Sequence, residues 1–86
     1  MSTIARLPRK MQVCQFHNDH DPPHFHVRQA GTNTLIRIAD LTILRGSISR
    51  GDLLLVQNWA RVHQGELALN WVLARAGMDL REIQYP

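Results

Sequence analysis

Residues 19–27 read Asp19-His20-Asp21-Pro22-Pro23-His24-Phe25-His26-Val27 and hold three of the chain's five histidines and two of its seven acidic residues. His24 and His26 are two positions apart. On an extended backbone this spacing directs both imidazoles to one face and the apolar side chains beside them to the other. The two prolines restrict φ, and the residue before each is biased towards extended conformations. The stretch therefore predicts a β-strand that begins near His24 and carries a histidine pair behind a stiff connector.

The segments around this stretch also have the character of strands. Short runs of β-formers, separated by turn residues, predict strands over 11–17, 24–30, 34–38 and 43–45, with turns over 31–33 and 40–42. Connections this short join neighbouring antiparallel strands. Residues 10–46 are therefore expected to form an antiparallel meander of three to four strands. A basic N-terminal arm over residues 1–9 is expected to precede it.

The hydrophobic period becomes helical in the C-terminal half of the chain. Ser49 is a favourable N-cap, and Asp52 suits the positive end of the helix dipole three residues later. Gly65 weakens the helix near its middle, and Gly77 suits the position just after its end. The side chains at helical spacing are Val56, Trp59, Ala60, His63 and Leu67. We therefore expect two helices, over 50–63 and 66–76, or one bent helix, within residues 49–77.

These elements together predict an α+β fold. A small antiparallel sheet would pack one face against the two C-terminal helices, and residues 78–86 would follow as an extended tail. With 86 residues, the chain is expected to form a single domain over 1–86. A sheet this small has exposed edges, which favours pairing with another chain, and a homodimer is one form of such pairing.

Charge and composition restrict the classes of function. Arg6, Arg9 and Lys10 precede every acidic residue, and the other seven basic residues equal the seven acids in number, so the net charge of +3 is expected to lie in the N-terminal arm. Nucleic-acid contact is then expected only through this arm, because binding proteins usually carry a broader positive face. Cys14 is the single cysteine, which excludes an intrachain disulfide. No apolar run approaches the ~18 residues of a membrane span, and a cytoplasmic protein is expected.

The histidine stretch is compatible with a metal site. His24 and His26 would be ligands, with His20 or Asp19 supplying a further one. Neutral imidazoles and a carboxylate suit a divalent cation such as zinc or iron. His17, at the end of the preceding strand, is the remaining nearby imidazole. A His-x-His pair alone does not establish such a site.

Two metal-free interpretations remain open beside it. In the first, imidazoles that titrate near neutral pH share the acid and base roles of phosphodiester cleavage, and an arginine stabilises the developing charge. The candidate catalytic residues are His20, His24, His26 and Arg28. In the second, the histidines bond to backbone carbonyls and nearby carboxylates, and so brace the proline turn while the strand face docks on a partner. This structural role, without a cofactor, is the interpretation that the sequence favours.

Three motifs carry a likeness to a known family. They are Thr3-Ile4, His20-x-Pro22-Pro23-His24-Phe25-His26-Val27 and Trp59-x-x-x-His63-x-x-Glu66-Leu67-x-x-x-Trp71. With these motifs the chain resembles the bacterial domain-of-unknown-function family 4160 over nearly its whole length. It departs from the family pattern at the second turn, where Leu41-Thr42 follows the acid in place of the usual glycine.

The resemblance implies a partner more directly than a reaction. Family members are often encoded beside another small family of unknown function, 2442, and are suspected components of toxin–antitoxin pairs. We therefore expect a protein-interaction component of a small bacterial two-gene module, with the protein encoded by the adjacent gene as its partner. The alternative is a ribonuclease-type toxin, His-dependent or metal-dependent, that uses His20, His24 and His26.

Overall fold

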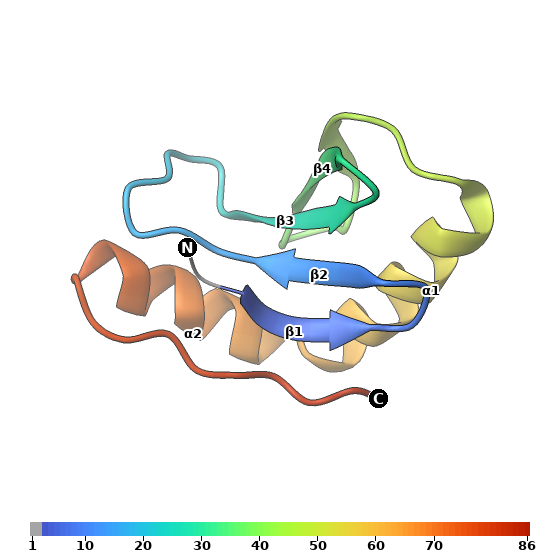
Figure 1. Ribbon diagram of the computed structural model, residues 1–86. Helices are drawn as coiled ribbons and strands as arrows, with labels where there is room; N and C mark the ends of the chain where they lie inside the picture. Colours follow the sequence, from blue (N-terminus) through green and yellow to red (C-terminus); the bar gives the residue numbers. More distant parts are fainter. Residues whose placement is uncertain (1–2) are drawn as a thin grey trace.

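The computed structural model describes residues 3–86. Its elements are β1 (Thr3–Leu7), β2 (Met11–Cys14), β3 (His24–Gln29), β4 (Thr32–Arg37), β5 (Ile43–Arg45), α1 (Arg50–Val62) and α2 (Gln64–Arg75). The strands form one antiparallel sheet in the order β1-β2-β3-β4-β5, followed by the two helices (Figure 1). The predicted α+β meander with two C-terminal helices is confirmed. The sheet has five strands, one more than the upper end of the expected range.

The additional strand lies where we expected a basic arm. Residues 3–7 form β1 at the edge of the sheet, and residues 1 and 2 of the expected arm lie outside the described residues. Ile4, Ala5 and Leu7 are buried. Arg9 and Lys10 follow with φ of 63° and 58° and turn the chain into β2. The apolar side chains of this segment are buried by pairing with β2, and this burial outweighs the local preference of a charged, proline-containing segment for coil.

The hairpin between β3 and β4 is tighter than the sequence predicted. Ala30 and Gly31 have φ of 47° and 81°, so they alone form the two-residue turn, as in type I′ hairpins. Thr32 and Asn33, which we expected in the turn, are the first residues of β4. Asn33 pairs with Arg28 and is thereby carried onto the face of the sheet that holds the histidines.

Local signals for the helices are confirmed. The Ser49 side chain accepts a hydrogen bond from the backbone N–H of Asp52 and caps α1. Gly77 has a φ of 72°, and the N–H of Met78 donates to the Leu73 carbonyl at 2.9 Å, which closes α2 as a Schellman motif. Within residues 3–86, neither helix is long and apolar enough to span a membrane.

One face of the sheet packs on the helices, and this packing determines which side chains lie on the opposite face. Phe25 pairs with Ile36, and Val27 is buried with them in a core that includes Trp59 and Leu67 of the helices. A register slip of one residue would expose these side chains, so their burial fixes the orientation of β3. The alternate residues of β3 must then lie on the opposite side, which we call the open face. The tail returns beside β1, where the N–H of Ile83 donates to the Ile4 carbonyl (Figure 1).

Candidate metal centre

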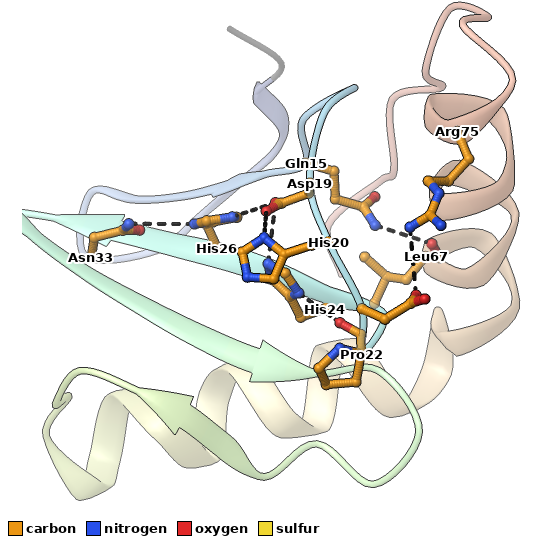
Figure 2. Close-up of polar contacts among 10 residues, drawn as sticks. Gln15, Asp19, His20, Pro22, His24, His26, Asn33, Leu67 and Arg75 are labelled. Atoms are coloured by element: carbon orange, nitrogen blue, oxygen red, sulfur yellow. Dashed lines mark hydrogen bonds and ion pairs between the residues drawn. The ribbon is translucent and has the colours of Figure 1, made fainter.

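Two histidines and one aspartate meet on the open face of the central strand. His24 and His26 lie on β3 and are 2% and 9% exposed. The segment of residues 15–23 folds back over them and brings the Asp19 carboxylate between their rings (Figure 2). We call Asp19, His24 and His26 the candidate centre. The predicted emergence of the two imidazoles on the same face is confirmed.

The ring of His26 is held at both nitrogens. Its Nε2 lies 2.8 Å from Oδ2 of Asp19, and its Nδ1 lies 3.3 Å from the amide nitrogen of Asn33. An amide nitrogen only donates, so the His26 Nδ1 accepts and its Nε2–H donates to the carboxylate. The ring also packs at 4.8 Å, edge to face, on Phe16. The His26 imidazole is therefore fixed in orientation and in tautomer.

His24 has the opposite tautomer and an unsatisfied nitrogen. Its Nδ1 lies 2.7 Å from the Pro22 carbonyl, which only accepts, so Nδ1 carries the hydrogen. In the neutral ring, Nε2 then presents a lone pair. This Nε2 lies 3.1 Å from the same Oδ2 of Asp19, but it is buried and makes no hydrogen bond within residues 3–86, because the oxygen lies off the direction a ring N–H would take. Such a buried, ligand-ready nitrogen needs an electrophile or a proton.

Opposing effects act on the charge of Asp19. Burial raises the pKa of this carboxyl, but the hydrogen bond from His26 and the nearby imidazoles of His24 and His26 lower it more, so its pKa lies below the ordinary value of 3.8. At neutral pH the centre therefore contains a carboxylate anion between two imidazoles. Such an anion is a ligand for a cation.

Two of the three spacings between the ligand atoms suit one divalent cation. One atom from each residue of the centre can be chosen so that all three lie within 4.8 Å of one another. Atoms bound at about 2.0–2.1 Å to one metal are about 2.9 Å apart at right angles and about 3.4 Å apart in a tetrahedron. The Asp19 separations of 2.8 and 3.1 Å match the right-angle value. The third separation, between the two imidazole nitrogens, is within 4.8 Å and would have to be about 4 Å or less for one cation to bind both. Binding would thus bring the rings into the facial arrangement of two histidines and a carboxylate.

The family model described as Domain of unknown function (DUF4160) matches residues 13–72. The chain belongs to this family. Searches of curated proteins and of solved structures gave no match. The matched DUF4160 region contains all three residues of the candidate centre, together with β3 and β4 that support it.

The other predicted site residues of this DUF4160 protein lie at the edge of the candidate centre or outside it. His20 is exposed, with its Nδ1 4.0 Å from Oδ1 of Asp19 and its ring 6.3 Å from that of His24. Arg28 is exposed on the same face of β3 as the histidines. His17 bonds the Met78 carbonyl at 3.0 Å and does not join the centre. The structure thus brings Asp19, His24 and His26 together and leaves His20 at their mouth.

Supporting residues of the centre were missed from the sequence. Trp71 of α2 packs at 5.2 Å on His24, and Arg75 covers the Trp71 ring at 5.8 Å. Arg75 also pairs with Asp21 at 3.5 Å, which ties α2 to the segment that carries Asp19 (Figure 2). Asn33 was assigned to a turn and so was not considered as a partner of His26. Only the positions of these residues in the folded chain identify their roles.

Proposed function

We propose that this protein is a divalent-cation-binding domain in which Asp19, His24 and His26 hold Zn²⁺ or Fe²⁺. The observation that supports this best is the His24 ring, whose Nδ1–H donates to the Pro22 carbonyl while its buried Nε2 has no hydrogen-bond partner among residues 3–86. A carbonyl that orients a ligating imidazole through its far nitrogen is the usual support of metal-binding histidines. Acid–base use alone would not require the Nε2 of His24 to lie 3.1 Å from a carboxylate oxygen without a hydrogen bond to it in the described residues.

Cation binding would require a coupled change at His26. Its Nε2–H, which now donates to Asp19, would be lost, and the hydrogen would move to Nδ1. Nδ1 would then need an acceptor, which Asn33 can supply by turning its amide so that Oδ1 replaces Nδ2. Asn33 is therefore suited to support both tautomers of the His26 ring. In the metal-free protein, the hydrogen on Nε2 of His26 lies between the ring and Asp19, where the cation would bind.

The proposed activity is hydrolytic. Three protein ligands leave coordination positions for water and substrate, as in catalytic rather than structural zinc sites. A bound cation lowers the pKa of its water and so supplies hydroxide at neutral pH. His20, 90% exposed at the mouth of the centre, is suited to exchange a proton with solvent or with a leaving group. We assign this activity to the cytoplasm.

Isothermal titration with Zn²⁺ and with Co²⁺ tests the proposal. We expect one cation per chain for the unmodified protein and no specific binding for the His24→Ala/His26→Ala double variant. His17→Ala is the matched control, because it removes an imidazole outside the centre. Co²⁺ also reports its ligands through its visible spectrum. Unchanged stoichiometry in the double variant, or equal loss in the control, would exclude this centre as the binding site.

A second candidate function is docking of a protein partner. The observation that favours it is the exposure of large apolar side chains on the helices, including Val62 at 76% and Val72 at 61%. Where such side chains form a contiguous patch, the patch marks a surface for association. The partner that we propose is the protein encoded by the adjacent gene, in a two-gene module of the toxin–antitoxin type. Co-expression of the two proteins tests this, with Val62→Lys/Val72→Lys expected to abolish co-purification and the double histidine variant expected to retain it.

A further inference from the structure

Basic side chains gather on the open face although they are scattered in the sequence. Residues that are directly opposite in an antiparallel pair lie on the same face. The register of β1 to β4 therefore gives a row of side chains across the sheet: Arg6, Gln12, Arg28 and Asn33. A second row runs from Cys14 through His26 and Leu35 to Arg45 on β5. Arg37 pairs with His24 on the same face.

Four of the seven acidic residues are engaged at other positions, and Glu82 of the tail lines a hollow beside Arg6 of β1. On the open face, Asp19 lies within the candidate centre and Asp40 pairs with Arg37 at 3.2 Å. Asp52 is bound by Arg9 at the start of α1, and Asp21 by Arg75 of α2. Arg6, Arg28 and Arg45 are all exposed. The positive charge, which we expected to be confined to an N-terminal arm, is thus spread across the sheet.

Two shallow hollows connect Arg6, Lys10 and Arg28 into a continuous track, which does not include Arg45. One, of about 250 Å³, is lined by Lys10, Gln12, Arg28 and Asn33 together with the β3–β4 turn. The other, of about 280 Å³, is lined by Arg6, Lys10 and Gln12. They share Lys10 and Gln12, so the track runs from the edge strand to Asn33. Asn33 in turn contacts His26 of the candidate centre.

We infer that the open face binds single-stranded nucleic acid through its phosphodiester backbone. Arginine is the preferred partner of phosphate because its planar fork donates two parallel hydrogen bonds. Strands lie about 4.8 Å apart, so Arg6 on β1 and Arg28 on β3 are about 10 Å apart, and one extended strand can contact both. A broad sheet face presents no element that enters a duplex groove, whereas sheets serve as platforms for single strands. The inference needs no cation in the centre.

The test is fluorescence anisotropy with labelled single-stranded RNA, single-stranded DNA of the same sequence and the corresponding duplex. Chelator is present throughout, so failure of the proposed cation site leaves the result unaffected. We expect binding to the single strands, with log K falling against log salt by about 0.7 for each phosphate contacted. The Arg6→Gln/Arg28→Gln/Arg45→Gln variant should lower this slope by about 2. The RNA and DNA arms identify which polymer is preferred.

The matched control is Arg50→Gln/Arg61→Gln/Arg81→Gln, which removes the same charge from the helices and the tail. We expect it to retain the salt dependence of the unmodified protein. Equal losses in the two triple variants would attribute binding to net charge and overturn the inference, as would absence of binding or a preference for the duplex. Circular dichroism melting verifies that each variant is folded, and single Arg6→Gln and Arg45→Gln variants provide the same comparison if the triple variant unfolds.

Discussion

Replacing Asp19 by asparagine should change the stability of the metal-free domain little but should strongly lower its affinity for the cation. In the metal-free protein, His26 would lose a hydrogen bond to a charged acceptor, of the kind that contributes about 1.5–3 kcal/mol, but would keep a neutral acceptor of the same shape. The atom that accepts from His26 is the same one that lies 3.1 Å from the Nε2 of His24, so as an amide oxygen it cannot also donate there, but the substitution removes a negative charge from beside that unprotonated nitrogen. These effects oppose each other. We expect the free energy of unfolding to change by less than about 1 kcal/mol, and the melting temperature by less than about 8 °C.

With zinc the two proteins should differ. A ligand present at 100 times its Kd stabilises the folded state by about 2.7 kcal/mol, which corresponds to a rise in melting temperature of roughly 10–20 °C for a domain of this size. Loss of the anionic ligand should weaken binding by at least about 100-fold, within the range of effects seen when a metal site is disturbed. At the same zinc concentration, Asp19→Asn would then gain only about 0.4 kcal/mol, or roughly 2–3 °C.

Differential scanning calorimetry with and without zinc measures both quantities. Asp79→Asn is the matched control, because it removes an exposed carboxylate of the tail that lies outside the centre and outside the segment that carries Asp19. The control should respond to zinc as the unmodified protein does. If zinc raised the melting temperature of Asp19→Asn as much as that of the unmodified protein, Asp19 would not be a ligand of the bound cation.

Three further predictions concern the scaffold. The pKa of Asp52 lies below its ordinary value of 3.8 because Arg9 donates a hydrogen bond to it. The contribution of Asp52 to stability should therefore be complete above about pH 4 and lost as the pH falls through the lowered pKa. In urea denaturation from pH 2 to 7, Asp52→Asn should remove this part of the pH dependence. Leu67 is fully buried, and Leu67→Ala should lower the unfolding free energy by about 2–5 kcal/mol in the same assay. Gly46 has a φ of 91°, and a Cβ there would lie 2.6 Å from the Asn33 carbonyl; Gly46→Ala should therefore lower the melting temperature, whereas Gly65→Ala, in open space, should not.

Most of the fold follows from signals that are local in the sequence. Ser49 and Gly77 limit the helical part because a cap acts on the turn beside it. The alternation around Phe25 predicts which side of β3 is buried. The β1 strand was missed because its pairing with β2 is a tertiary effect, which charges at Arg6 and Arg9 conceal in the sequence. Such non-local pairing decides strands more often than intrinsic preference does.

The sequence indicates where the candidate site lies in the chain, but it does not show which side chains come together to form it. The His-x-His pair and the prolines indicated the stretch whose residues the structure brings together, and Asp19 was among the candidate ligands. Whether Asp19 or His20 turns inward depends on how residues 15–23 fold over the sheet, and the ion pair of Arg75 with Asp21 ties this segment to α2. The basic track was missed for a similar reason, because it depends on the register between strands and not on the order of arginines in the chain.

The most direct test of the proposed centre is anomalous diffraction from crystals grown with Zn²⁺ and recorded on both sides of the zinc absorption edge. We predict one peak per chain, about 2.0–2.2 Å from the Nε2 atoms of His24 and His26 and from a carboxylate oxygen of Asp19. The Asn33 amide should be turned so that Oδ1 accepts from the Nδ1 of His26. A peak held by other residues, or a centre in which His26 still donates directly to Asp19 at saturating zinc, would contradict this account.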